Sequence, residues 1–563
     1  MRIGNCSGFY GDRLAAMREM LDGGELDVLT GDYLAELTML ILFRSRAKDP
    51  AKGFATTFLR QLEDCLGTAV DRGVRIVVNA GGLNPAGCAD AVRALAQRLG
   101  VDAAVAHVEG DDLLPRAAAL GLAGDGQPLT ANAYLGAAPI AEALAGGAHV
   151  VVTGRVTDAA LVCGPAMWRQ GWSATDYDAL AGAVVAGHVL ECGAQATGGN
   201  YAFFAEVPGL EHAGFPIAEV AADGSSVVTK HPGTGGLVSV GTVTAQLLYE
   251  IGSPRYLGPD VVARFDTIEL AQEGPDRVRI SGVRGEPPPP DVKVALNVLG
   301  GFRNAVTFVL TGLDLSAKAD LVTRQMRAAF PGAEAVLSRA DVGDPDTNEA
   351  ATATLRLTVK DASPDRIGRA FSSAAVELGL ASYPGFTMTA PPGDASPYGV
   401  YRPAYVPRAA VTAVVVHADG RRVEVPFGPV GAAAPVVVPD DRAVAVGGET
   451  ARVPLGRVAG ARSGDKGGDA NLGVWVRTPD AYGWLRDFLT VERLKALLPE
   501  TAPLDVARHE LPNLSALNFV VSGLLGEGVA ASTRADPQAK GLGEWLRARV
   551  VDVPVALLGE GAG

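Results

Sequence analysis

The sequence predicts an α/β fold class, with an N-terminal, mostly parallel sheet flanked by helices. Over the first 240 residues, short β-branched runs alternate with longer stretches of helical periodicity, the pattern of βαβ units. Most of these runs end in a glycine-rich polar cluster. The chain is 48% hydrophobic and 20% charged, which allows large buried cores and excludes a disordered protein. Its 563 residues are enough for more than one domain.

Two runs show how strands lead into polar loops. The run at 75–78 continues into Asn79-Ala80-Gly81-Gly82, and the run at 149–152 continues into Thr153-Gly154-Arg155. Between them, apolar residues at helical spacing predict helices over 54–72 and 86–99. Open α/β sheets bind ligands outside the carboxyl ends of their strands. The polar residues that follow these strands are therefore the first candidates for a functional site.

The pattern changes after a proline run at 287–290. We expect an N-terminal region over 1–440, made of a glycine-loop, parallel-sheet part (1–285) and a ferredoxin-like α+β part (290–435). The ferredoxin-like part rests on the order of its predicted elements: strands at 292–299, 305–310 and 351–359, and helices at 321–330 and 366–378. Asp419-Gly420 then joins the strands of a hairpin at 411–416 and 421–425.

A smaller C-terminal α/β domain is predicted over 453–555, after a boundary near 435–452 that is marked by alanine, proline and glycine. Its strands would include 472–477 and 518–521, and a helix would cover 482–489.

Charge and cysteine content exclude several classes of protein. A formal net charge of -14 provides no basic face for nucleic acid. The five cysteines are widely spaced and form no CxxC pair, which favours neither a disulfide framework nor a zinc ribbon. No uninterrupted apolar stretch reaches about 18 residues, so we expect no membrane partner. These features predict a cytoplasmic protein.

Several long segments resemble the acyclic terpene utilisation protein A (AtuA-like) family, including its appended C-terminal ferredoxin-fold domain. The segments are GFYGDR (8–13), DYLAELTM (32–39), NAGGLNP (79–85), VVTGRVTDAAL (151–161), GHVLECGAQATGGNY (187–201), HPGTGGLVS (231–239), QLLYEI (246–251) and ARSGDKGGDANLGV (461–474). The family takes its name from gene clusters that degrade citronellol- and geraniol-type compounds through branched acyl-CoA thioesters. The resemblance thus implies an acyl-CoA context and association with a biotin-dependent carboxylase, but neither a reaction nor a substrate.

Four residues are candidates for catalysis. Glu191 heads a glycine-rich loop and Asp158 follows an apolar strand, so both could act as general acid or base. Asp32 lies four residues before Glu36, and two carboxylates on one helical face can separate their pKa values. His231 opens a loop rich in free amides. The rival interpretations are contacts with loop backbone for Glu191, a structural pair with Arg155 for Asp158, a solvated cap for Asp32 and a structural role for His231.

A larger set could bind the substrate. Arg155 could hold a carboxylate or phosphate in a bidentate manner unless it only pairs with Asp158, and Lys466 could bind a CoA phosphate or a substrate carboxylate. The other candidates would contribute loop amides or polar side chains unless these only satisfy their own loops: Gly8, Gly11, Asp12, Arg13, Asn79, Gly81, Gly82, Asn84, Gln195, Thr197, Asn200, Thr234 and Ser463. None of the loops has the Walker A or GxGxxG spacing, so a nucleotide is not indicated.

Other patterns carry less weight. Gly4 to Gly8 matches a nucleophile elbow around Cys6, but no histidine with a partner acid is marked out, which favours an incidental thiol. His188, Glu191 and Cys192 could share a helical face, but without a second ligand cluster we expect no metal. Asp344, Asp346 and Asn348 lack the glycine and glutamate of a calcium loop. No cofactor is expected, apart from CoA as part of the substrate.

The leading hypothesis is an enzyme that acts on an acyl-CoA or a branched or hydroxylated carboxylic acid. Carboxylates, a histidine and amide-rich loops suit proton abstraction with addition or loss of water, as in a hydro-lyase, and a carbon-carbon lyase would need the same groups. The alternatives are a non-catalytic assembly subunit for an acyl-CoA carboxylase and a small-molecule binding protein. We expect a homo-oligomer.

Overall fold

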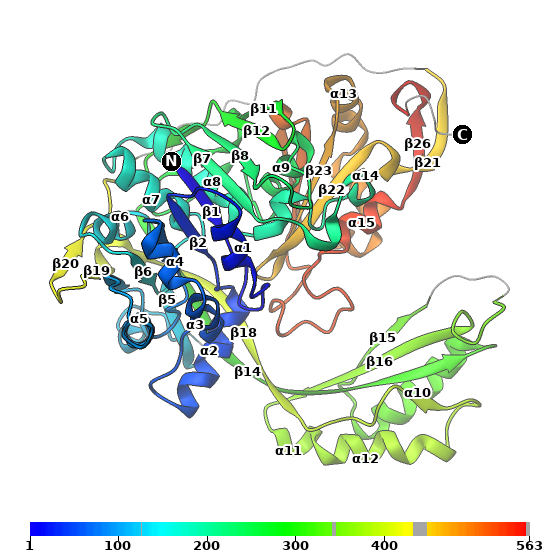
Figure 1. Ribbon diagram of the computed structural model, residues 1–563. Helices are drawn as coiled ribbons and strands as arrows, with labels where there is room; N and C mark the ends of the chain where they lie inside the picture. Colours follow the sequence, from blue (N-terminus) through cyan, green and yellow to red (C-terminus); the bar gives the residue numbers. More distant parts are fainter. Residues whose placement is uncertain (125, 340–344, 432–447, 559–563) are drawn as a thin grey trace.

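The computed structural model describes residues 1–124, 126–339, 345–431 and 448–558, apart from the side chains of Glu36 and Leu37. It is an α/β protein built on a large mixed sheet (Figure 1). Five central strands are parallel, in the order β1 (Arg2–Asn5), β2 (Val28–Gly31), β3 (Arg75–Val78), β6 (Val150–Thr153) and β4 (Val105–Glu109). The predicted fold class is confirmed, and the parallel arrangement holds for this centre.

Antiparallel strands extend the sheet on both sides of the parallel centre. Beyond β1 lie β7 (Pro216–Val220), β8 (Ser226–Lys230), β12 (Arg277–Ser281) and β11 (Glu269–Gly274). Beyond β4 lies the predicted hairpin, β19 (Ala413–Val416) and β20 (Arg422–Val425). This hairpin joins the large sheet through β4, although we expected it within the ferredoxin-like part (290–435).

Helices cover both faces of the sheet because its central strands are buried on both sides. Val77 and Val151 face one core, whereas Ile76, Val78 and Val152 face the other. The first core includes α6 (Ala138–Ala145), α7 (Ala160–Gln170), α8 (Tyr177–Leu190) and α9 (Val240–Leu247). The second includes α1 (Ala16–Asp22), α3 (Thr56–Glu63), α4 (Leu66–Asp71) and α5 (Pro85–Leu99). The helix predicted over 54–72 is divided into α3 and α4.

The order of the parallel strands determines where loops meet. From β1 to β4 the strands are added in one direction across the sheet, but a gap is left between β3 and β4. The chain later returns to fill this gap with β6, so the direction of strand addition reverses there. The carboxyl ends of β2, β3 and β6 are consequently neighbours. Such a reversal is where open α/β sheets open a crevice for ligands.

A ferredoxin-like arm projects from the body of the molecule (Figure 1). Its sheet order, β15-β16-β14-β17, is that of a βαββαβ unit. After β14 (Asp291–Thr311), the elements are α10 (Leu315–Ala329), β15 (Glu334–Ser338), β16 (Thr352–Asp361), α11 (Pro364–Ile367), α12 (Arg369–Glu377) and β17 (Thr387–Met388).

The two strands predicted at 292–299 and 305–310 are one 21-residue strand, β14. A register shift between Leu299 and Gly301, with Gly301 at φ +125°, accommodates the glycine pair without ending the strand. The first part of β14 pairs with β18 (Ser396–Pro407) and with β5 (Pro128–Ala133), whereas its second part pairs with β16 in the arm. The helix α2 (Glu36–Lys48) lies near β5, β14 and β18.

The C-terminal domain has an antiparallel sheet in the order β22-β23-β25-β24. Its elements are β21 (Thr450–Pro454), β22 (Ala459–Lys466), β23 (Asp469–Val476), α13 (Pro479–Phe488), α14 (Val491–Leu497), β24 (Val506–Leu511), β25 (Ala516–Val521), α15 (Leu542–Arg547) and β26 (Val550–Pro554). We predicted a loop at 463–468, but Ser463 to Lys466 continue β22. Only Gly467 and Gly468 form the turn, because Lys466 pairs directly with Asp469.

This domain contacts the segment that follows α9. Asn471 accepts a hydrogen bond from the Glu250 amide (2.7 Å), and Asn518 donates one to the Gly252 carbonyl (2.6 Å). The small sheet of β9 (Arg255–Leu257), β10 (Val262–Arg264) and β13 (Arg284–Glu286) follows in sequence. Among the described residues, no helix has the length and apolar character required to span a bilayer.

Candidate functional site

Three carboxylates meet at the carboxyl edge of the parallel sheet. Oxygen atoms of Asp32, Asp158 and Glu191 all lie within 4.8 Å of one another. Asp32 directly follows β2, Asp158 lies between β6 and α7, and Glu191 follows the last residue of α8. We call these three residues the carboxylate cluster. The structure thus brings together three of the four residues predicted for catalysis.

Asp32 is fixed by the strand ends around it. Its side chain is buried, and Oδ1 accepts hydrogen bonds from the Leu34 amide (2.9 Å) and from Asn79 Nδ2 (2.7 Å). Asn79 follows β3, and its own Oδ1 accepts a hydrogen bond from the Tyr33 amide (2.7 Å). Burial, and then the charge of Asp158, raise the pKa of Asp32 well above its ordinary value. Asn79 therefore joins the ends of two neighbouring strands.

Arg155 supplies the positive charge of the site. Its Nη2 lies 2.6 Å from Asp158 Oδ1, and Nη1 donates to the Leu34 carbonyl (3.1 Å). The guanidinium lies 4.4 Å from the ring centroid of Tyr134, and only 5% of the side chain is exposed. A buried guanidinium held in this way orients Asp158 and compensates part of the negative charge of the cluster.

Asp111 fixes the backbone of Arg155 and was not among the predicted site residues. Its Oδ2 accepts hydrogen bonds from the Arg155 amide (2.8 Å) and Asn132 Nδ2 (2.9 Å). Burial raises the pKa of Asp111 to about 7. A Cβ atom on Gly154 would lie 2.5 Å from its carboxylate, so Gly154 is required for this close approach. Asp111 follows the parallel strand β4, the same signal that identified Asp32.

Glu191 is nearly buried and lies among other charged groups. Its side chain is 9% exposed, and Oε2 is buried without a hydrogen bond in the described structure. Burial raises its pKa well above the ordinary value, and the charges of Asp158 and Glu250 raise it further. Carboxylates that share such a site hold a proton more tightly than isolated ones.

His188 lies beside Glu191, one turn earlier on α8. Its Nδ1 is 3.5 Å from Glu191 Oε1, and neither ring nitrogen makes a hydrogen bond with the described residues. The ring contacts Tyr256 and Phe265, with centroids 5.0 and 5.5 Å away. Burial lowers the pKa of His188 to about 4, so the imidazole is neutral at pH 7. The sequence had suggested His188 only as a metal ligand.

The loop at 8–13 packs against the loop that follows Glu191. A Cβ atom on Gly8 would lie 2.7 Å from the backbone of Cys192. Asp12 accepts a hydrogen bond from the Gly8 amide (2.8 Å), and Arg13 donates to the Ala213 carbonyl (3.0 Å). Gly11 approaches only Phe9. These residues hold the two loops together rather than contacting the carboxylate cluster.

Other predicted binding residues have contacts that stabilise loops. Gly81 donates its amide to Thr153 (3.0 Å), and Gly82 has a φ of +52° that favours glycine. Asn84 caps α5 through the Gly87 amide (3.0 Å). Thr197 donates to the Gly214 carbonyl (2.6 Å). Asn200 is exposed at the end of its loop.

His231 and Thr234 lie away from the carboxylate cluster. His231 Nε2 is 2.9 Å from the Met20 carbonyl at the end of α1, and its ring would collide with a Cβ atom on Gly23. Burial lowers the pKa of His231, and the nearby charge that lowers it further is Arg2. Thr234 donates to the His231 carbonyl (2.7 Å). Of the four predicted catalytic residues, His231 is the one that the structure does not bring to the cluster.

The C-terminal domain contacts the edge of the site. Arg462 hydrogen-bonds Gln195, three residues after Cys192, and Lys466 Nζ lies 3.2 Å from the Glu250 carbonyl. The Lys466 charge also acts to lower the pKa of Glu191. Ser463 Oγ instead accepts a hydrogen bond from the Gly543 amide (2.9 Å), within the C-terminal domain. Lys466 is thus the predicted residue that extends this domain toward the carboxylates.

Of three further sequence patterns, the described residues test only the one around Cys6. Cys6 is buried, and burial raises the pKa of its thiol, which argues against a nucleophile. The side chain of Glu36 is outside the described atoms, so the predicted pair with Asp32 is untested. The rejected calcium loop begins at Asp344, which lies outside the described residues.

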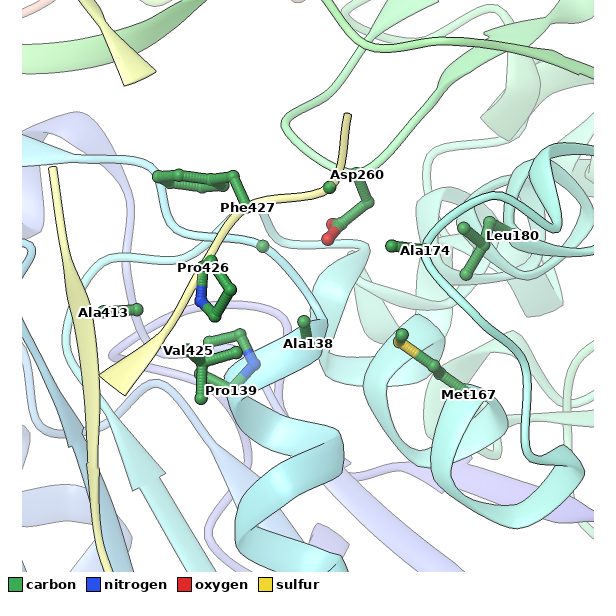
Figure 2. A pocket seen from close by; sticks show the side chains of 12 residues that line it. Ala138, Pro139, Met167, Ala174, Leu180, Asp260, Ala413, Val425, Pro426 and Phe427 are labelled. Atoms are coloured by element: carbon green, nitrogen blue, oxygen red, sulfur yellow. The ribbon is translucent and has the colours of Figure 1, made fainter. Parts of the chain in front are cut away.

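A separate pocket lies on the α6 side of the molecule (Figure 2). It is lined mostly by apolar side chains, including Pro139, Met167 and Phe427, around a cavity of about 20 Å³. Both carboxylate oxygens of Asp260 accept hydrogen bonds from the Ala137 amide at 2.9 Å. A cavity of this size holds about one water molecule. Asp260 therefore anchors the start of α6, and the cavity is too small for a second substrate site.

Together these features define an α/β protein with a largely buried acidic site at the carboxyl edge of a parallel sheet. The model of the acyclic terpene utilisation family protein AtuA matches residues 1–417, and that of the AtuA ferredoxin-like domain matches residues 453–552. The chain therefore belongs to the AtuA family, as its sequence segments indicated. No curated protein and no solved structure matches it.

Proposed function

We propose that the protein is an acid/base enzyme that acts on an acyl-CoA or on a branched or hydroxylated carboxylic acid, by addition or loss of water. The observation that carries the proposal is the convergence of Asp32, Asp158 and Glu191 within 4.8 Å. They lie on three separate elements at the edge where α/β enzymes place their sites. A stable fold gains nothing from gathering like charges, so a chemical role explains the arrangement better.

The cluster contains groups for both proton transfers of a dehydration. One carboxylate removes the proton α to the carbonyl, and a protonated carboxyl donates to the departing hydroxyl, which leaves as water. Glu191 is the proposed acid because its side chain is only 9% exposed, which favours the protonated form, and its Oε2 makes no hydrogen bond with the described residues. Asp158 is the proposed base because Arg155 keeps it oriented and its side chain is 30% exposed. Hydration is the reverse of this sequence.

The surroundings support an anionic substrate. Lys466 lies near Glu191 from the C-terminal domain, and Lys293 lies 5.0 Å from the Tyr134 ring that also contacts Arg155. Ammonium groups beside the site favour a carboxylate or the phosphates of CoA. His231, which we expected to position the substrate, is not part of the proposed site.

One observation favours the alternative role as an assembly subunit. On the projecting arm, Leu313 and Leu380 are largely exposed, and Val376 is 51% exposed. Exposed apolar side chains of this kind mark protein contacts when they gather on one surface. A biotin-dependent acyl-CoA carboxylase is the proposed partner for this role. The same surface is also the proposed contact between copies of this chain in a homo-oligomer.

The test combines binding with turnover. Thermal shifts across acyl-CoA thioesters and the matching free acids should identify a ligand, since a ligand at about 100 times its Kd adds about 2.7 kcal/mol of stability. With that ligand, Glu191→Gln and Asp158→Asn should abolish turnover and keep binding, and Asp90→Asn, at an exposed ion pair, should change neither. Full turnover in both site variants would reject the roles assigned to Glu191 and Asp158, and no turnover of any ligand by the wild type would reject the enzyme. Carboxylase stimulation without turnover would favour the assembly role.

A further inference from the structure

The carboxylate cluster also has the dimensions of a cation site. Its three oxygens lie within 4.8 Å of one another and come from Asp32, Asp158 and Glu191. Oxygen ligands around one Mg²⁺ ion lie about 2.1 Å from it, and thus about 3 to 4 Å from each other. An oxygen pair at the 4.8 Å limit would have to close by about 1 to 2 Å for both atoms to bind one ion.

One oxygen of each aspartate in the cluster accepts the hydrogen bonds. Both hydrogen bonds to Asp32 fall on Oδ1, and the Arg155 contact of Asp158 also falls on Oδ1. Glu191 Oε2 is buried and makes no hydrogen bond with the described residues. Asp32 and Asp158 are therefore each held through one oxygen, and Glu191 has a buried oxygen available for a ligand.

An independent observation comes from His188. The side chain is 1% exposed, it makes no hydrogen bond through either ring nitrogen, and Nδ1 points to Glu191 Oε1 at 3.5 Å. Imidazole N–H groups commonly orient the carboxylates that hold a metal ion. A buried imidazole that makes no hydrogen bond with the described residues and lies beside Glu191 is placed to orient that carboxylate toward a bound group.

The local charge fits a divalent ion. Three ionised carboxylates carry three negative charges, and Arg155, which contacts Asp158, offsets one of them. Lys466 and Glu250 both act on Glu191, with opposite signs. The remaining two negative charges equal the charge of one divalent cation.

We propose that Asp32, Asp158 and Glu191 bind a hard divalent cation of the Mg²⁺ and Mn²⁺ class, with His188 as the positioning residue for Glu191. The ligands are all carboxylate oxygens, the donor type that these ions prefer. The sequence alone had led us to expect no metal. It offered only His188, Glu191 and Cys192, because Asp32 and Asp158 are distant from them in the chain.

The inference rests on the proposed function in that both use the same carboxylates. A cation held here would polarise a carbonyl or hydroxyl oxygen of the substrate, the task assigned above to a carboxyl proton. Cation binding itself can be measured without any substrate.

The experiment titrates Mn²⁺ into chelator-treated, full-length protein and follows free Mn²⁺ by electron paramagnetic resonance. We expect one ion per chain. Asp32→Asn and Glu191→Gln should weaken its binding by about tenfold or more, and His188→Phe by less, with partial recovery in His188→Gln. The control Asp90→Asn should bind as the wild type. Absence of saturable binding up to about 1 mM, or unchanged binding in both carboxylate variants, would overturn the proposal.

Two controls separate misfolding and function from cation binding. Without cation, the amide variants should melt at or above the wild-type temperature, since each removes a like charge. Mn²⁺ should then raise only the wild-type and Asp90→Asn melting temperatures. Mn²⁺ binding by a protein that turns over no substrate would refute the proposed enzyme function and support the cation site. Turnover that survives chelation, in a protein that binds no Mn²⁺, would refute the cation site and support the enzyme function.

Discussion

Asn79 donates a 2.7 Å hydrogen bond to Asp32, and this contact joins the ends of two adjacent parallel strands at the acidic site. Both ends of the Asn79 amide make a hydrogen bond, because its oxygen accepts from the Tyr33 backbone. Asn79 thus determines which oxygen of Asp32 remains available.

Replacing Asn79 with Ala should remove both contacts and leave the Tyr33 amide without its acceptor. We expect a loss of about 1 to 3 kcal/mol of stability and a lower kcat with little change in KM, because Asp32 would lose its orientation. Thermal melting and steady-state kinetics would measure the two effects. Asn79→Asp should be worse than Asn79→Ala, since it places a fourth carboxylate beside Asp32. Equal stability in both variants would contradict this account.

The contact between Arg155 and Asp158 should show strong coupling. Arg155→Met alone leaves a carboxylate cluster without its nearest positive charge, which we expect to cost about 3 to 5 kcal/mol. The double variant with Asp158→Asn should be less destabilised than the sum of the two single variants. A double-mutant cycle of melting measurements would determine the coupling energy. Additive effects within about 0.5 kcal/mol would show that the pair does not act as a unit.

Asp111 should make stability depend on pH. The folded protein holds its proton up to a pKa of about 7, whereas the unfolded chain releases it near the ordinary value of 3.8. The stabilisation of the fold by this proton is therefore complete below pH 3.8. It decreases as pH rises to 7, by roughly 1.4 kcal/mol per pH unit. Groups that face Asp111 are Asn132, the Arg155 amide and the charge of Asp112, which raises its pKa further.

Asp111→Asn isolates that effect, because an amide oxygen can still accept from Arg155. Relative to the wild type, its melting temperature should rise steadily between pH 4 and pH 7. Parallel curves for the two proteins would show that Asp111 does not retain a proton in the fold.

Gly8→Ala should push the loop at 8–13 away from the loop that follows Glu191. Its Cβ atom would lie 2.7 Å from the Cys192 backbone, which has no flexible side-chain end that could move away. We expect a loss of about 1 to 3 kcal/mol and reduced turnover. Gly67→Ala is the matched control, since Gly67 lies in α4 and its nearest neighbour is 3.7 Å away. That control should be stabilised by about 0.5 to 1 kcal/mol.

Much of the site could be predicted because it depends on a local signal. Asp32, Asn79 and Asp158 all follow apolar strands, and the carboxyl ends of those strands share one edge of the sheet. His231 also follows a strand, β8, but β8 lies beyond antiparallel β7, and the sequence does not specify this lateral order. Lys466 belongs to strand β22, and its Nζ lies 3.2 Å from the Glu250 carbonyl, which is distant in the sequence.

The fold was predictable to a similar extent. Alternating β-branched runs and helical periods identified the central strands and the crossover helices. The glycine pair at 300–301 resembled a break between strands, and only pairing with β18 and β16 on its two sides shows that β14 continues through it. Asp111 was overlooked because Gly110-Asp111-Asp112 has the composition of an ordinary turn.

The continuity of β14 joins the arm to the surroundings of the acidic site. One end of the strand forms the arm, and the other pairs with β5, directly before Tyr134. The Tyr134 amide donates to the Lys293 carbonyl of β14 (2.9 Å), and the Leu135 amide donates to the Arg155 carbonyl (3.1 Å). The Tyr134 ring also contacts the Arg155 guanidinium. A single unbroken strand therefore runs from the arm to the residue that packs on Arg155.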